Sequence, residues 1–248
     1  MGIVEKAMHT QNSMPQLIFT KDGSHSLWMP ELDEAYHSRH GAIQESKHIF
    51  IQHGLLHWLN NQAPSSVNLL EVGLGTGLNV LLTHLALLTK PVHTTYTGLE
   101  PYPIPWQYIR RFNYAAQLAQ QKNCPITYKD LQATFEKLHQ GAATSFCKLS
   151  DYFLLKKSNR SLQDFSAPPN TFDIVYFDAF SPNKQPAMWS VDLLQKVYHM
   201  MKHHGIMVTY CAQGKLKRDL KRLGMHLESL PGPPGKKEMT RARKEIPI

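Results

Sequence analysis

The 248-residue sequence predicts an α/β fold with a mostly parallel, seven-stranded sheet, helices on both faces and a small N-terminal extension. From Val67 onward, short apolar runs alternate with longer amphipathic segments, which is the pattern of repeated βα units. Directly after the first of these runs come Gly73, Gly75 and Gly77, whose flexible backbone suits a tight turn from strand to helix. The chain is long enough for one α/β domain with an extension.

We expect the extension over residues 1–64 and the α/β domain over residues 65–248. In the extension, Asp22-Gly23 predicts a hairpin turn, and apolar residues at helical intervals predict a helix over 42–62. The predicted strands of the domain are 67–73, 94–100, 145–151, 172–180 and 205–211, with further candidates at 225–230 and 238–243. The predicted helices are 78–88, 106–121, 131–139, 191–203 and the basic segment 215–224.

The glycine spacing indicates which class of nucleotide the turn would hold. A Rossmann-like dinucleotide site uses G-x-G-x-x-G, whereas the third glycine here comes one residue early, and no P-loop lysine follows Gly77. Glu71 precedes the first glycine by two residues, where a carboxylate would repel a pyrophosphate and attract a cation. S-adenosylmethionine carries a sulfonium and an ammonium, so the motif favours this cofactor. A purely structural turn with Glu71 at its edge is the alternative.

Two further carboxylates end predicted strands. Glu100 ends the second strand, where it can accept hydrogen bonds from both ribose hydroxyls of an adenosine. Asp151 ends the third predicted strand and is followed by Tyr152 and Phe153, so it could bind the adenine amino group, or it could simply open a surface loop.

The fourth predicted strand leads into Asp178, at the switch point where doubly wound sheets bind their ligands. Pro182 and Pro186 stiffen the loop that follows, and Lys184 and Trp189 on this loop are placed to touch a substrate.

Composition excludes several other classes of protein. The N-terminal segment lacks the long apolar stretch of a signal peptide or membrane helix. Three scattered cysteines predict neither disulfides nor a thiolate zinc site, and His53 and His57 lack a third ligand, so we expect a soluble cytoplasmic protein without a metal.

The last part of the chain is basic, and the whole chain carries a formal net charge of +8. Such a surface is typical of proteins that bind polyanions, although a solvated helix face and tail would give the same charge. The candidate RNA-binding residues are Lys215, Lys217, Arg218, Lys221, Lys236 and Lys237.

The segments EVGLGTGLNVLLT, GLEPYP, FDIVYFDAFSPNKQPAMW, GIMVTYCAQGKLKRDLKRLGM and GPPGKKEM, in this order, resemble the MnmC-type tRNA methyltransferases, which are class I S-adenosylmethionine-dependent enzymes. The N-terminal DGSHSLWMPELDEAYHSRHGAIQESKHIFIQHGL is similar to the stand-alone branch of that family. The resemblance implies N-methylation of 5-aminomethyl-(2-thio)uridine at the tRNA wobble position. Family members with a fused flavin oxidase also perform the preceding step; we expect no such domain and no flavin here, so another enzyme would supply the aminomethyl group.

The resemblance also assigns residues by position. The cofactor contacts would be Glu71, Gly73, Gly75, Gly77, Glu100 and Asp151, with Tyr36, Glu45 and Ser46 near the cofactor. Asp178 would be the catalytic carboxylate, and the tRNA would present its anticodon loop.

Three alternatives stay open at this point. A methyl- or aminopropyl-transferase for a small amine would use a similar glycine turn and strand-ending aspartate, although the basic C-terminal part argues against it. A non-catalytic RNA-binding protein would not need Glu71, Glu100 and Asp178. An NAD-dependent dehydrogenase fits the glycine spacing poorly.

Overall fold

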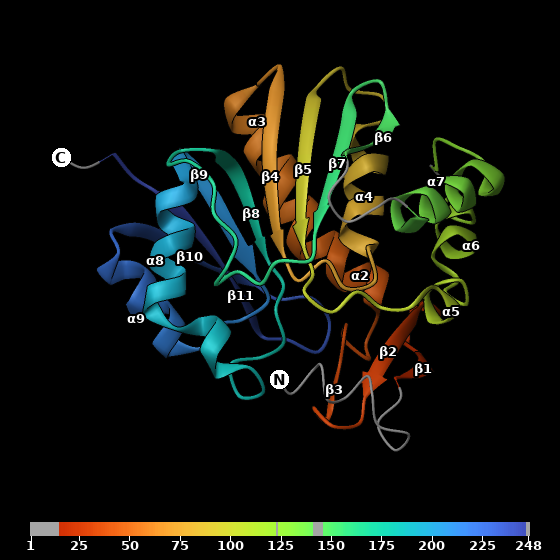
Figure 1. The fold of residues 1–248 in the computed structure, drawn as a ribbon, viewed down its shortest axis with the longest axis horizontal. Helices are drawn as coiled ribbons and strands as arrows, with labels where there is room; N and C mark the ends of the chain where they lie inside the picture. Colours follow the sequence, from red (N-terminus) through yellow and green to blue (C-terminus); the bar gives the residue numbers. More distant parts are fainter. Residues whose placement is uncertain (1–14, 123, 141–145, 247–248) are drawn as a thin grey trace.

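A computed structural model describes residues 15–122, 124–140 and 146–246. Its described part contains one mixed sheet of eight strands in the order β10-β11-β9-β8-β4-β5-β7-β6, and a three-stranded sheet, β1-β2-β3 (Figure 1). The strands are β1 Gln16–Phe19, β2 His25–Met29, β3 Glu34–Ala35, β4 Ser66–Val72, β5 His93–Leu99, β6 Phe146–Ser150, β7 Phe153–Ser158, β8 Phe172–Phe177, β9 Met201–Thr209, β10 Met225–Pro231 and β11 Glu238–Lys244. The helices are α2 Ala42–Ser46, the π-helix η1 Lys47–Leu56, α3 His57–Gln62, α4 Leu78–Leu87, α5 Trp106–Ile109, α6 Tyr114–Ala119, α7 Tyr128–Gln140, the 3-10 helix η2 Pro186–Trp189, α8 Val191–Met200 and α9 Gly214–Arg222.

The five central strands, from β9 to β7, pair in parallel, and both edges of the sheet are antiparallel. The mostly parallel α/β sheet predicted from the sequence is therefore present, with eight strands instead of seven.

The additional strand is β7. The sequence prediction merged β6 with the residues that follow it, whereas the chain turns back at Asp151-Tyr152, and Ser150 pairs with Phe153 in an antiparallel hairpin. This two-residue turn lacks the Asn-Gly or Asp-Gly signature of tight hairpins, so the local sequence did not predict it. The parallel strand beside β5 is β7, and it ends at Ser158.

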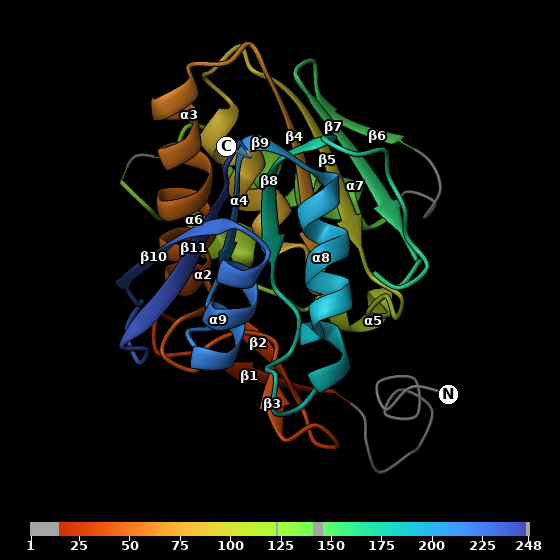
Figure 2. The ribbon, with the colours of Figure 1, turned by 90° about the vertical axis from the view of Figure 1, so that its left-hand side faces the viewer.

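Side chains of the central strands alternate between two cores. Leu69 of β4 and Tyr176 of β8 pack in the cluster beneath η1 and α4, while the neighbouring Leu70 and Phe177 pack in the cluster beneath α8 and α9. Figure 2 shows the sheet between the α2–η1–α3 segment on one side and α8 on the other. Because both faces of the central part of the sheet are covered, every residue of β8 is buried.

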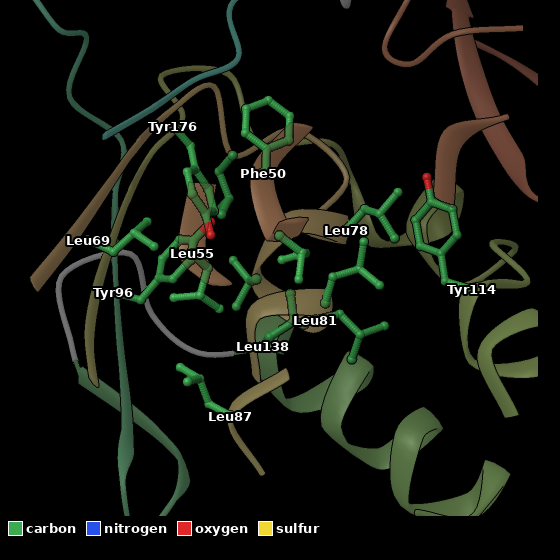
Figure 3. Close-up of a cluster of buried hydrophobic side chains, with 14 of the residues drawn as sticks. Phe50, Leu55, Leu69, Leu78, Leu81, Leu87, Tyr96, Tyr114, Leu138 and Tyr176 are labelled. Carbon is green, nitrogen blue, oxygen red and sulfur yellow. The ribbon is translucent and has the colours of Figure 1, made fainter. Parts of the chain in front are cut away.

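The first cluster also joins the N-terminal segment to the α/β domain. Phe50 of η1 lies 5.0 Å from Tyr176 between ring centroids, and Figure 3 shows both with Leu55 in the same cluster. The boundary between residues 64 and 65 stays a prediction.

Most predicted helices are present with shifted ends. The helix predicted over 42–62 is helical throughout, with the π-helix η1 in its middle, whereas the one predicted over 106–121 is broken into α5 and α6. The helix predicted over 191–203 stops at Met200, where β9 begins. No described helix is long and apolar enough to span a membrane.

The hairpin of the extension forms around Asp22-Gly23 as predicted, with Gly23 at a φ of 81°. Strands β1–β3 lie below the lower ends of β4 and β5 in Figure 1, and Tyr36, just after β3, lies against Gly75. The extension thus covers the edge of the sheet at which the parallel strands end.

Candidate active site

A cavity of about 670 Å³ opens at the carboxyl ends of β4, β5 and β8. Its walls come from the glycine turn after β4, the segment after β5, the loop after β7, the loop after β8, the residues 33–39 of the extension and the tip of the β10–β11 hairpin. Ligands of open α/β sheets bind at this edge.

The glycine turn forms the floor of the cavity. A Cβ on Gly73, whose φ is 90°, would lie 2.5 Å from the backbone oxygen of Asp178, so only glycine lets the turn pass this close to β8. Gly75, with a φ of 49°, meets the ring of Tyr36 in the same way, its added Cβ lying 3.0 Å away. Both glycines line the cavity, so a ligand can approach the backbone of the turn.

Glu100 stands beside this turn at the end of β5. Its carboxylate accepts hydrogen bonds from the backbone N–H of Gly75 at 2.9 Å and of Tyr102 at 3.1 Å, which fix its position while it lines the cavity. Burial raises the pKa of Glu100 to about 7, against the lowering effect of these two hydrogen bonds. Each carboxylate oxygen can still accept another hydrogen bond.

Asn79, in the first turn of α4, joins two carboxyl groups. Its Nδ2 donates to Oε1 of Glu71 at 2.8 Å and to Oδ2 of Asp178 at 2.9 Å. The other oxygen of Glu71 accepts from the hydroxyl of Tyr96 at 2.8 Å. Burial, and then the charge of Asp178, raise the pKa of Glu71 well above its ordinary value. Glu71 is fully buried and does not line the cavity, so it acts on the site through Asn79.

Asp178 follows β8 directly and lines the cavity. Two charged residues from other parts of the cavity wall, Glu45 and Lys236, interact with it electrostatically. Burial and the charge of Glu45 raise the pKa of Asp178 to about 7, while the Asn79 hydrogen bond and Lys236 lower it. Lys236 pairs with Oε1 of Glu45 at 2.6 Å and lies 3.8 Å from the ring centroid of Tyr210. A carboxyl group with a pKa near 7 can exchange protons at neutral pH.

Comparison with known proteins agrees with this geometry. A family profile described as S-adenosyl-L-methionine-dependent methyltransferase matches residues 113–245. The chain belongs to this family. Its relatives include the bifunctional protein MnmC for tRNA 5-methylaminomethyl-2-thiouridine biosynthesis of Burkholderia multivorans, at 27% identity over 90% of this chain and 34% of that protein. MnmC of Magnetococcus marinus is 31% identical over 89% of this chain and 33% of its own length.

The chain therefore spans about one third of the length of these curated relatives. The crystal structure of MNMC2 from Aquifex aeolicus superimposes with a TM-score of 0.72 at 22% identity, covering 99% of this chain and 77% of that one. The MnmC-type resemblance and the fold class predicted from the sequence are confirmed.

The cavity of this methyltransferase fits S-adenosylmethionine on its own chemistry. Asn79 lines the cavity, and its buried Oδ1 has no hydrogen-bond partner among the described residues, so this oxygen is available to an ammonium group. Glu100 would hold the ribose hydroxyls, and Gly73 and Gly75, which have no side chain to clash with Asp178 and Tyr36, line the cavity beside it.

Of the residues expected from the sequence, eight line the cavity: Tyr36, Glu45, Gly73, Gly75, Glu100, Asp178, Lys184 and Lys236. Others lie behind its wall. Gly77 packs against Leu138 and His139 of α7, and Ser46 is buried, with an unpartnered Oγ. Their roles in binding stay predictions.

The expectation that Asp151 contacts the adenine is wrong, because the strand before it is not a parallel strand that ends at the cavity. Asp151 lies in the β6–β7 turn beside the start of β5, whereas Glu100 follows the other end of β5, and the Asp151 side chain is 85% exposed and paired with Lys148. The segment that reaches the cavity after the parallel strand is instead the loop with Ser161, Leu162 and Gln163.

Trp189 is likewise not placed to touch a substrate. It is 4% exposed, its indole N–H donates to the backbone oxygen of Phe180 at 2.8 Å, and its ring packs on Phe177. The neighbouring Met188 lines the cavity in its stead.

Sequence reasoning missed Asn79, His37 and Trp28, which all line the cavity. Asn79 had a usable signal, because a polar side chain at the second helical position after the glycines points back to the strand ends. His37 is buried, which lowers its pKa to about 4, and its ring nitrogens lie near the hydroxyls of Ser26 and Thr76. The described residues hold no cluster of metal ligands.

The predicted basic residues divide into two groups. Lys215, Lys217, Arg218 and Lys221 lie on α9, outside the cavity wall, and Lys237 is exposed at the tip of the β10–β11 hairpin. Lys236 points into the cavity instead, where it pairs with Glu45. Binding of RNA by the exposed group stays a prediction.

Proposed function

We propose that this methyltransferase transfers a methyl group to the aminomethyl nitrogen of 5-aminomethyl-(2-thio)uridine at the wobble position of tRNA. The observation that supports this most directly is Asp178, a cavity-lining carboxyl group with a pKa raised to about 7 beside the glycine turn. The similarity to MnmC proteins over about nine tenths of the chain supports the tRNA substrate.

Asp178 performs the main chemical task of the chain. It accepts a hydrogen bond from the substrate amine, directs the nitrogen lone pair along the line of attack, and takes the proton released as the N–C bond forms. S-adenosylmethionine supplies the electrophilic methyl group when bound and leaves as S-adenosylhomocysteine. Asn79 holds Asp178 in place through its 2.9 Å hydrogen bond.

The neighbouring groups suit an amine. Glu45 and Asp178 both line the cavity, where Lys236 pairs with Glu45 and lowers the pKa of Asp178. Carboxylates stabilise the positive charge that develops on the nitrogen during transfer. We propose that the reaction needs neither flavin nor metal.

The wobble nucleotide lies in a single-stranded loop, so it can turn out of the stack without breaking a duplex. In this proposal the tRNA binds through its anticodon loop in the cytoplasm, and an upstream enzyme supplies the aminomethyl group.

The test is mass spectrometry of wobble nucleosides in tRNA from a strain that lacks the protein. Accumulated 5-aminomethyl-2-thiouridine, converted to the methylated form by purified protein with S-adenosylmethionine, is the expected result. An unchanged nucleoside profile together with no methyl incorporation into tRNA would overturn the proposal, and methylation of a metabolite pool would favour the small-amine alternative.

Asp178→Ala should lower kcat by about 10² to 10⁴, as for a positioned acid-base group. Cofactor binding, measured by calorimetry, should remain. A variant with the wild-type rate would remove Asp178 from the mechanism.

A further inference from the structure

The mouth of the cavity carries an aromatic ring and two cationic side chains that the chemistry described above does not use. Trp28 comes from β2, Arg39 from the segment before α2, and Lys184 from the loop after β8, and all three line the cavity. These three residues form the rim of the cavity. They come from two walls, the extension and the α/β domain, which meet where Nζ of Lys184 lies 3.6 Å from Oδ2 of Asp33.

The guanidinium of Arg39 is available to an anionic ligand. Its guanidinium lies 4.5 Å from the ring centroid of Trp28, its side chain is exposed, and it makes no ion pair within the described residues. A guanidinium stacked on an indole keeps its planar donors in a fixed orientation while its charge stays unneutralised.

Lys184 is only weakly engaged. Its Nζ lies 3.6 Å from Oδ2 of Asp33, whose side chain is 76% exposed. An exposed pair at this separation contributes little, so an incoming anion can displace Asp33.

The basic helix α9 differs in this respect. Lys215 pairs with the buried Asp219 at 2.7 Å, and Lys217 pairs with Glu238 at 2.7 Å. Only part of the α9 charge is therefore available to a polyanion, and none of it lines the cavity.

We propose that the rim is the site that grips the RNA strand at the target nucleotide, with Arg39 and Lys184 binding its flanking phosphates and a base stacking on the Trp28–Arg39 pair. This inference rests on the proposed function, because it takes the substrate to be a nucleotide of a single-stranded loop. A nucleotide that enters the cavity brings its two phosphates to the mouth, where the two cations stand. Stacking on aromatic rings and contacts to phosphates are how proteins hold unpaired RNA.

The experiment measures binding of a fluorescein-labelled anticodon stem-loop RNA, with uridine at the wobble position, by fluorescence anisotropy over a series of KCl concentrations. The test variant is the double substitution Arg39→Gln and Lys184→Gln. A second variant removes two charges from α9 for comparison, Arg218→Gln and Lys221→Gln, both exposed and without an ion pair in the described structure.

The rim variant should bind about tenfold more weakly, as expected for charge-assisted hydrogen bonds that are lost. The slope of log affinity against log salt should fall by about 1.4, or 0.7 for each single-strand phosphate contact. Arg39→Lys keeps the charge but loses the planar stack, so it should restore the slope and only part of the affinity. Trp28→Leu should weaken binding with the slope unchanged.

A rim variant with wild-type affinity and slope overturns the inference, whatever the α9 variant does. The same holds if Trp28→Leu binds as tightly as the wild type while circular dichroism shows it folded. Methylation of tRNA by the wild type separates the two proposals: if methylation occurs and the rim variant binds normally, only the rim assignment fails, whereas no methylation of any tRNA is the failure of the proposed function.

Discussion

Lys236 and Glu45, 191 residues apart in the sequence, form a 2.6 Å ion pair that joins the β10–β11 hairpin to helix α2 at the wall of the cavity. Lys236 also lies over Tyr210, whose hydroxyl donates to the backbone oxygen of Ala179, the residue after Asp178. The pair thus ties three segments together around the carboxyl group that we propose as the proton acceptor.

The first prediction concerns the charge on each side of this pair. Lys236 lowers the pKa of Asp178 and Glu45 raises it. Lys236→Met should therefore move the ascending limb of the pH profile of kcat to higher pH, and Glu45→Gln should move it to lower pH. Lys236→Arg, which keeps the charge, should restore the wild-type limb. Stopped-time methylation assays across pH measure all three.

Other ionisable groups near Asp178 do not change in these variants. Glu71, Tyr96 and Tyr210 interact electrostatically with Asp178 and remain in place. Shifts of the same sign in both variants would mean that loss of the contact, and not of the charge, controls the profile.

The second prediction concerns Glu100 and the cofactor. The pKa of Glu100 is raised to about 7 in the free protein, and hydroxyl donors favour its ionised form. Affinity for S-adenosylmethionine should therefore increase as the pH rises toward 7 and then level off. Glu100→Gln should bind more weakly and with a smaller pH dependence, because Asp178 in the same cavity still titrates near pH 7. Isothermal titration calorimetry at several pH values tests both, and a Glu100→Gln protein with the wild-type pH dependence would contradict the assignment.

The third prediction concerns stability without ligand. The folded-state pKa of Asp178, about 7, exceeds its ordinary value of 3.8, so the folded protein binds the proton more tightly than the unfolded chain. This contribution to stability is complete below about pH 4 and is lost as the pH rises to about 7. Asp178→Asn removes the cost of burying the charge and should increase the free energy of unfolding by roughly 1–2 kcal/mol at pH 8, with little change near pH 4. Urea unfolding at the two pH values measures the difference.

The fourth prediction concerns Asn79, whose Nδ2 donates to both Glu71 and Asp178. Asn79→Ala leaves two buried carboxyl oxygens without their donor, and it should cost about 1–3 kcal/mol of folding free energy. It should also weaken cofactor binding, because the amide of this cavity-lining residue, with its unpartnered Oδ1, is lost. Asn79→Ser retains a small donor, so its free energy of unfolding should lie between those of the wild type and Asn79→Ala. Unfolding curves that match the wild type would contradict a bridging role.

The sequence was sufficient for much of this site. The glycine turn follows a predicted strand, and Glu100 and Asp178 each stand at the end of another. Because parallel strands end at the same side of a sheet, these positions come together. Asp151 failed because the β6–β7 turn reverses the chain at a dipeptide without a turn signature. The position of Lys236 depends on how a hairpin tip packs on α2, and no local pattern encodes a contact over 191 residues.

The fifth prediction concerns Trp189, which is buried and does not line the cavity. Its indole fills the space between Phe177 and Tyr210 and donates to the backbone oxygen of Phe180, so its role is to support the loop after β8. Trp189→Ala should lower the free energy of unfolding by about 3–5 kcal/mol, as for other large buried aromatic residues. Trp189→Phe keeps most of the packing and should cost less, with KM for tRNA unchanged, because the ring does not line the cavity. If Trp189→Phe is as stable as the wild type but its KM rises strongly, the indole contacts the substrate after all. Thermal unfolding and steady-state methylation on the same preparation distinguish the two outcomes.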